Sequence, residues 1–139
     1  MNHLIVKQEP WNLSAATILA AACDETFTIS DLQADCESGR ASLFNIFSND
    51  EAHIASMALR VDGEGDHKEM VVVAGGGYLK GASLYKVLTP YVEALAVQNG
   101  CRFLRGHTSR RGIGRLMENA GWEQSEIIFR KRVSDGRKI

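Results

Sequence analysis

The sequence predicts one α/β (α+β) domain: a mixed, mainly antiparallel central sheet of about six to seven strands, flanked by about four helices. Apolar segments with strand-like patterning fill residues 41–74. A glycine run, Gly75–Gly77, follows at once, and apolar residues at helical spacing come next, over 83–98. The chain of 139 residues is long enough to bury a core without disulfides or metals.

The order of the expected elements predicts a mixed sheet covered by helices. We expect strands at residues 3–9, 41–47, 52–62, 67–74, 101–106, 122–124 and 126–133, and helices at 13–23, 31–37, 83–98 and 110–119. The strands between 41 and 74 form an antiparallel meander. The single domain is expected to cover residues 1–133, with 134–139 as a flexible tail.

Capping residues mark where the helices begin and end. Asn12 or Ser14 can cap the first helix, and Ser30 can cap the second. Gly39 follows the second expected helix, at the position where glycine commonly ends a helix. Pro90 lies inside the third helical pattern and predicts a kink or a late helix start.

Composition narrows the class of protein. The formal net charge is −1, and no apolar stretch reaches the 18 residues of a membrane span. The apolar segment 13–23 has no basic residues before it of the kind that precede a signal sequence. Cys23, Cys36 and Cys101 are scattered and odd in number, which favours reduced thiols in the cytoplasm and argues against a disulfide framework or a metal site.

Charge is distributed unevenly along the chain. Residues 1–100 carry six Lys/Arg and thirteen Asp/Glu, whereas residues 101–139 carry ten and four. The basic third could serve a polyanionic cofactor, a nucleic acid, or the acidic part of the same fold. Nucleic acid is disfavoured because Phe103, Trp122 and Phe129 have the pattern of core residues and leave no stacking platform.

The glycine run is the main candidate for a binding site. The apolar strand enters Gly75–Gly77, and a helix follows after Gly81. Glycine allows a ligand to approach the backbone closely, and the start of a helix attracts anions such as phosphate. The alternative is a flexible connection between a strand and a helix.

With these elements in this order, the chain resembles the GNAT superfamily of N-acetyltransferases. The resemblance is carried by Val71–Gly77, Leu84–Gln98, Cys101–Arg105, Leu116–Trp122 and Ile127–Lys131. More narrowly, the chain is similar to small acetyltransferase-like proteins encoded by bacteriophages, some of which are virion components. The resemblance implies acetyl-CoA as co-substrate, bound at the end of the fourth strand, and an amine acceptor whose identity the sequence does not reveal.

The resemblance also implies which residues touch the cofactor. They are Val73, Ala74, Gly75, Gly76, Gly77, Tyr78, Lys80, Gly81, Ala82 and Arg111. Within this set Val73–Gly75 would hold the thioester or the pantetheine arm, and Gly75–Ala82 the pyrophosphate. The phosphate-loop pattern of the family is only partly present in this sequence, because the glycine at position 81 is the one residue that matches it.

Acetyl transfer needs a base for the ammonium group and an acid for the departing thiolate. The candidates are Glu69 on the strand before the glycines, and His107 and Ser109 after the fifth strand. Met117 stands where the family often has a proton-donating tyrosine. The alternative function is therefore a catalytically inactive protein with a structural, assembly or host-interaction role. Apolar edge strands near the C-terminus also favour a homodimer.

Overall fold

The computed structural model describes residues 3–78, 83–108 and 110–133. Its five strands form one sheet in the order β1-β2-β3-β4-β5. The strands are β1 Ile5–Gln8, β2 Ser42–Phe47, β3 His53–Asp62, β4 Glu69–Gly77 and β5 Phe103–Gly106. Neighbours from β1 to β4 are antiparallel, and β5 is parallel to β4. The mixed, mainly antiparallel sheet is confirmed.

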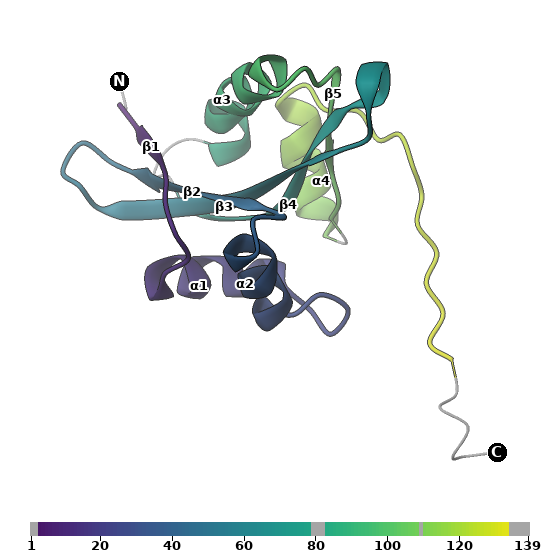
Figure 1. Ribbon diagram of the computed structural model, residues 1–139, viewed down its shortest axis with the longest axis horizontal. Coiled ribbons are helices and arrows are strands. Elements are labelled where there is room, and N and C mark those ends of the chain that lie inside the picture. The colour runs from purple at the N-terminus through teal and green to yellow at the C-terminus, as the bar shows by residue number, and fades with distance from the viewer. Residues whose placement is uncertain (1–2, 79–82, 109, 134–139) are drawn as a thin grey trace.

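Helices cover both faces of this sheet. They are α1 Leu13–Leu19, α2 Ile29–Glu37, α3 Leu84–Gln98 and α4 Arg111–Asn119, with short 3₁₀ turns η1 Ala20–Ala22 and η2 Gly65–His67. Figure 1 shows α1 and α2 on one face, α3 on the other, and α4 beside the β5 edge. None of the helices in the described residues is long and apolar enough to span a bilayer.

Each of the first two helices begins at a side-chain cap. Asn12 caps α1, because its Oδ1 accepts a hydrogen bond of 2.8 Å from the backbone N–H of Ala15. The cap of α2 is Thr28 rather than Ser30, so this helix begins two residues earlier than predicted. Thr28 and Asp31 bond each other's backbone N–H groups, and this reciprocal pair fixes the start.

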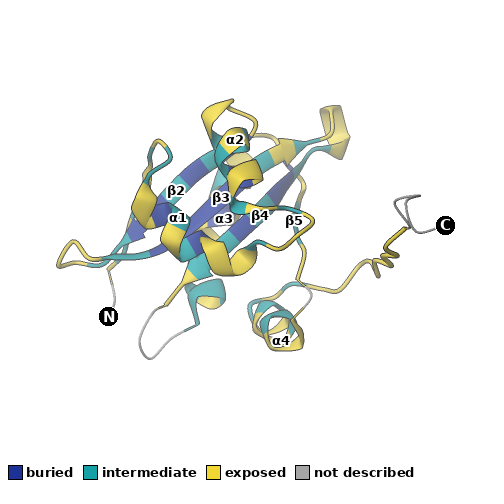
Figure 2. Cartoon of the chain, turned by 90° about the horizontal axis from the view of Figure 1, so that it is seen from below, coloured by how far each residue is buried: buried dark blue, intermediate teal, exposed yellow. Residues whose placement is uncertain are grey.

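The core has two parts, one on each face of the sheet. The cluster between the sheet and the helices α1 and α2 consists of Ala15, Leu19, Leu32, Leu43, Ala58 and Ala74. The cluster between the sheet and α3 consists of Ile46, Ala55, Met57, Leu59, Met70, Val92, Ala96 and Cys101. Figure 2 shows the buried residues concentrated on β2, β3 and β4, whereas α4 is only partly buried. All three cysteines are free thiols.

The two predicted C-terminal strands are not formed, and this is the reason that the sheet has five strands rather than six or seven. Residues 124–133 run away from the body without a strand partner (Figure 1). The apolar side chains behind the strand prediction are exposed here: Ile127 at 72%, Ile128 at 60% and Phe129 at 92%. An apolar pattern predicts a strand only where a neighbouring edge is available to pair with it. We call residues 124–133 the C-terminal arm.

Candidate functional site: the notch between β4 and β5

Strands β4 and β5 separate halfway along β4. They pair only from Glu69 opposite Phe103 to Val72 opposite Gly106. On its other side, β4 stays paired with β3 as far as Gly77. In the part of the chain that the structure describes, no strand therefore lies beside the β5-facing backbone of residues 73–77. We call this opening the β4–β5 notch.

A β-bulge marks the point where the notch begins. Ala58 of β3 pairs with Ala74 and Leu59 pairs with Val72, so Val73 is the extra residue on β4. A bulge interrupts the ladder and turns backbone groups away from the neighbouring strand. Val73 thus stands at the start of a stretch of backbone that can bond a ligand instead of a strand.

The three glycines continue β4 instead of forming the predicted loop. Gly75, Gly76 and Gly77 pair with Met57, Ser56 and Ala55. The strand therefore ends at residue 77 and not at residue 74.

Two of these glycines are needed for packing. A Cβ on Gly76 would lie 2.7 Å from the Ile18 carbonyl oxygen of α1, and one on Gly77, at φ +131°, would lie 2.4 Å from the Ile54 carbonyl oxygen. A Cβ on Gly75 would meet only Val72, at an ordinary 3.8 Å. Packing accounts for Gly76 and Gly77, which leaves Gly75 as the glycine of this run that is free to serve a ligand.

Arg110, at the start of α4, reaches across the fold to the α1 side. Its guanidinium donates a hydrogen bond to the carbonyl oxygen of Ala21 in η1. Burial raises the pKa of the Tyr85 phenol in the first turn of α3, and the positive charge of Arg110 partly opposes this rise. Tyr85 therefore keeps its proton at neutral pH. No local pattern in the sequence points to this residue, because its position depends on how α3 and α4 approach each other.

Met117 lies beneath β5 and has an apolar role. A Cβ built on Gly106 would stand 3.2 Å from the Met117 methyl group and 3.6 Å from the Trp122 ring. The indole N–H of Trp122 donates a 3.1 Å hydrogen bond to the Thr89 hydroxyl, which in turn donates to the Tyr85 carbonyl oxygen. These contacts join the end of α4 to α3.

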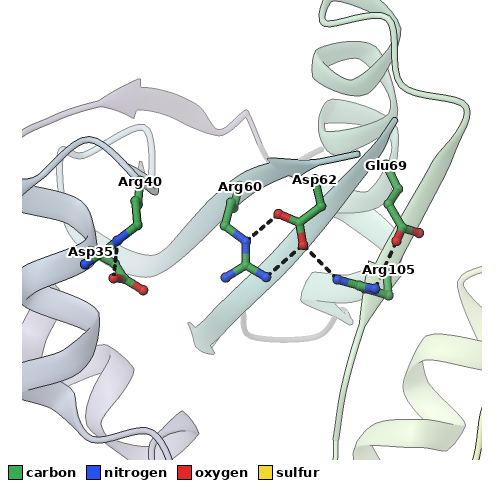
Figure 3. Close-up of polar contacts among 6 residues, drawn as sticks. All are labelled: Asp35, Arg40, Arg60, Asp62, Glu69 and Arg105. Atoms are coloured by element: carbon green, nitrogen blue, oxygen red, sulfur yellow. Dashed lines mark hydrogen bonds and ion pairs between the residues drawn. The ribbon is translucent and has the colours of Figure 1, made fainter. Parts of the chain in front are cut away.

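Glu69 lies at the far end of β4 from the notch, in a network of four charges (Figure 3). Its carboxylate pairs with Arg105 at 2.9 Å, and Arg105 also pairs with Asp62 at 2.9 Å. Arg60 bonds both oxygens of Asp62, at 2.7 and 2.9 Å. The hydrogen bond from Arg60, followed by the charges of both arginines, lowers the pKa of the Asp62 carboxyl. The structure therefore does not bring Glu69 together with the residues of the notch.

The other predicted site residues are placed as follows. Val73, Ala74 and Gly75 line the β4 side of the notch, and Tyr78 follows at its end with a 72% exposed side chain. His107 is exposed just after β5, and Arg111 is exposed at the first position of α4. Lys80, Gly81, Ala82 and Ser109 lie outside the described residues.

Comparison with known proteins identifies the fold. No protein-family model and no curated protein matches the sequence. Among solved structures, an aminoglycoside N-acetyltransferase in complex with CoA is 16% identical with a TM-score of 0.65, over 96% of this chain and 97% of that one. An acetyltransferase from Trypanosoma brucei is 14% identical with a TM-score of 0.66, over 94% and 100%. A GNAT family acetyltransferase from Staphylococcus aureus is 13% identical with a TM-score of 0.63, over 96% and 100%. The chain therefore has the fold of the GNAT acetyltransferases.

Proposed function

We propose that this protein binds acetyl-CoA in the β4–β5 notch and transfers its acetyl group to an amine. The observation that carries the proposal is the separation of the two strands directly after Val72, together with the bulge at Val73. The solved complex of a protein of this fold with CoA supports the choice of ligand. The acceptor remains an amine of unknown structure.

The backbone of β4 can hold an extended ligand as a strand would. Residues 73–77 offer N–H and C=O groups toward the side that β5 has left. The amide groups of a pantetheine arm can pair with these groups by the same geometry that joins two strands. An N–H at the bulge would polarise the thioester carbonyl and stabilise the negative charge that develops on its oxygen during attack by the amine.

The departing thiolate needs a proton, and Met117 has none to give. Tyr85 is the hydroxyl that the structure adds to the list of candidates, because it is half-buried in the first turn of α3, the helix that follows β4 in the chain. We propose Tyr85 as the acid of the transfer. Its position in the first turn of α3 supports this role, and so does its nearness to the charge of Arg110.

The second candidate function is a non-catalytic protein with a structural, assembly or host-interaction role. Two observations favour it. Met117 is half-buried and packs its methyl group against Gly106. Glu69, the predicted base, is held in an ion pair with Arg105 away from the notch.

A thermal-shift titration with acetyl-CoA and with CoA tests the proposal. We expect a saturable rise in melting temperature, since a ligand that binds only the folded state stabilises it. Gly75→Asp should abolish the rise, because a carboxylate there would face the anionic ligand without clashing with α1. No rise at millimolar ligand in the wild-type protein would overturn the proposal.

Turnover separates the two candidate functions. Release of the CoA thiol from acetyl-CoA is followed in the presence of a panel of primary amines and polyamines. Release that depends on the amine supports the acetyltransferase. Saturable binding without release of the thiol for any amine supports the non-catalytic protein. The Tyr85→Phe variant should bind acetyl-CoA as the wild type does and lose turnover about a hundredfold.

A further inference from the structure

A chain of hydrogen-bonded polar side chains runs through the α1/α2 face of the sheet, near the N-terminus of α1. Ser14 of α1 lies 2.6 Å from His53 Nδ1, and His53 Nε2 lies 2.8 Å from the Ser56 hydroxyl. Ser56 donates to Asn45 Oδ1 at 2.7 Å, and Asn45 Nδ2 donates to Glu9 at 2.9 Å. We call these five residues the Ser14–Glu9 chain. The proposed transfer reaction does not use any of them.

The inner end of this chain fixes the direction of every hydrogen bond. An ionised carboxylate such as Glu9 only accepts, so Asn45 must present its NH₂ group to it. The Asn45 carbonyl oxygen then faces Ser56, and the Ser56 hydroxyl must donate to it. Asn45 is fully buried and Ser56 is 1% exposed, so water does not offer an alternative partner.

This direction selects the tautomer of His53. The proton of the Ser56 hydroxyl is already committed to Asn45, so the Ser56 oxygen can only accept from His53 Nε2–H. A neutral imidazole carries one ring proton, and its Nδ1 therefore has a free lone pair. The hydrogen bond of 2.6 Å at Nδ1 is then donated by the Ser14 hydroxyl. The ring is held in place further by Phe47, whose centroid is 5.0 Å away.

The outer end of the chain is open to reagents. Ser14 is exposed to solvent, whereas His53 is half-buried. A hydroxyl that donates to an imidazole, which is itself oriented by a third group, is the arrangement that activates a serine for nucleophilic attack. Ser14, His53 and Ser56 have these three roles.

We propose that Ser14 Oγ is a nucleophile that takes an acyl group from an activated acyl ester, with His53 as its general base. The Ser14 oxygen forms a bond to the acyl carbon while its proton moves to His53 Nδ1. The bond from the acyl carbon to the leaving group breaks, and the leaving group departs with the electron pair. The imidazolium then releases its proton to the leaving group or to water. This site lies on α1 and β3 and is independent of acetyl-CoA binding in the β4–β5 notch.

Labelling with p-nitrophenyl acetate tests the proposal. The full-length protein is treated with the ester and digested with trypsin, and the peptide of residues 8–40 is sequenced by mass spectrometry. We expect one acetyl group on Ser14. Ser14→Ala should remove this label, and Ser38→Ala should keep it, because Ser38 is an exposed serine of the same peptide whose hydroxyl bonds a backbone carbonyl instead of a histidine. A peptide without acetyl on Ser14 would overturn the proposal.

The role of His53 needs its own variants. His53→Gln should slow the labelling of Ser14 about a hundredfold, as expected for the loss of a general base. Added imidazole should restore labelling to His53→Ala at Ser14, which a purely structural role for this ring would not allow. Equal labelling rates in His53→Gln and wild type would show that the histidine does not activate the serine.

The tautomer can be observed directly. A long-range ¹H–¹⁵N spectrum of the histidine rings distinguishes a protonated Nε2 from a protonated Nδ1. We expect neutral His53 to carry its proton on Nε2. A proton on Nδ1 would contradict the argument from Asn45 and Ser56, and Ser14 would then be a hydrogen-bond acceptor with no base beside it.

Discussion

The carbonyl oxygen of Ile18 in α1 lies 2.7 Å from the point where a Cβ would stand on Gly76. Helix α1 therefore packs directly on the backbone of β4, and this approach is possible only at a residue without a side chain. The contact places α1 over the strand that forms one side of the notch. Part of the glycine run thus serves the packing of the fold, although from the sequence it has the pattern of a ligand loop.

Gly76→Ala should destabilise the protein by about 1–3 kcal/mol, the usual cost of forcing a methyl group into a packed interface. Gly75→Ala is the matched control, because the added Cβ would meet only Val72 at 3.8 Å. Its effect on the free energy of unfolding should be small or slightly favourable. Urea denaturation of both variants measures the difference. Equal midpoints would show that α1 does not press on Gly76.

The order of the elements up to α4 could be predicted from the sequence because each has a local signal. Asn12 and Gly39 mark helix ends by chemistry that needs no distant partner. The C-terminal strands could not be predicted in this way. The apolar run at Ile127–Phe129 indicates that these residues favour a strand, but it does not indicate whether the edge of a sheet lies beside them. An apolar pattern close to the end of the chain is therefore the weakest kind of evidence for a strand.

The site was predicted less completely than the fold. Val73 is predicted by resemblance alone, and the structure places the β-bulge at this residue. The strand position of Glu69 predicts a base, but Arg105 comes from β5, and its ion pair with Glu69 depends on the parallel register of the two strands. Ser14 and His53 are 39 residues apart in the sequence, and Tyr85 is far in the sequence from Arg110. Nothing in the local sequence predicts such contacts.

The ion pairs of Asp62 predict a dependence of stability on pH. The folded-state pKa of Asp62 is lowered, so its stabilisation is fully present above the ordinary aspartate value of about 4 and is lost as the pH falls through the lower folded-state value. Asp62→Asn should therefore be less stable than wild type at pH 7, by less than about 1 kcal/mol because water screens this partly exposed carboxylate, and the difference should be smaller at pH 3.

Urea midpoints at the two pH values measure this effect. Asp66→Asn is the control, since Asp66 is exposed on η2 and makes no ion pair with any residue that the structure describes. A gap between wild type and Asp62→Asn that persists unchanged at pH 3 would mean that packing, and not the charge of the carboxylate, is responsible.

Arg111, at the first position of α4, is expected to contact the 3′-phosphate of CoA bound in the β4–β5 notch. Arg111→Ala is then expected to weaken binding of CoA several-fold and to leave binding of 3′-dephospho-CoA unchanged, because a charge-assisted contact to one phosphate is lost. Arg115→Ala, an exposed arginine one turn along α4, is the control. Calorimetric titration measures the affinities of the wild type and of each variant for both CoA and 3′-dephospho-CoA. The same loss for both ligands would remove Arg111 from the phosphate site.

The hydrogen bond between Trp122 and Thr89 should contribute to the stability of the α3–α4 contact. Trp122→Phe keeps an aromatic ring but removes the indole donor, at a cost of about 0.5–1.5 kcal/mol. Trp11→Phe is the comparison, since the described residues offer its indole nitrogen no hydrogen-bond partner. The Trp11 ring packs against the core cluster between the sheet and the helices α1 and α2. Thermal unfolding should show the larger loss for Trp122→Phe. The reverse order would assign the stability to ring size alone.

The C-terminal arm and the outer edge of β5 are exposed in the same molecule. Phe103 on β5 is 66% exposed, and Phe129 on the arm is 92% exposed. We propose that the arm of one copy pairs with β5 of a second copy, since a twofold axis lets both arms and both edges be covered at once. A chain ending at residue 123 should then be monomeric and still fold, because the arm is joined to the body by an exposed ion pair of Arg132 with Glu25 and by no described backbone hydrogen bond. Light scattering should find a dimer for the full chain and for Gln124→Ser, and a monomer for Phe129→Ser. A monomeric full chain would contradict the proposal, and a dimeric truncated chain would place the interface elsewhere.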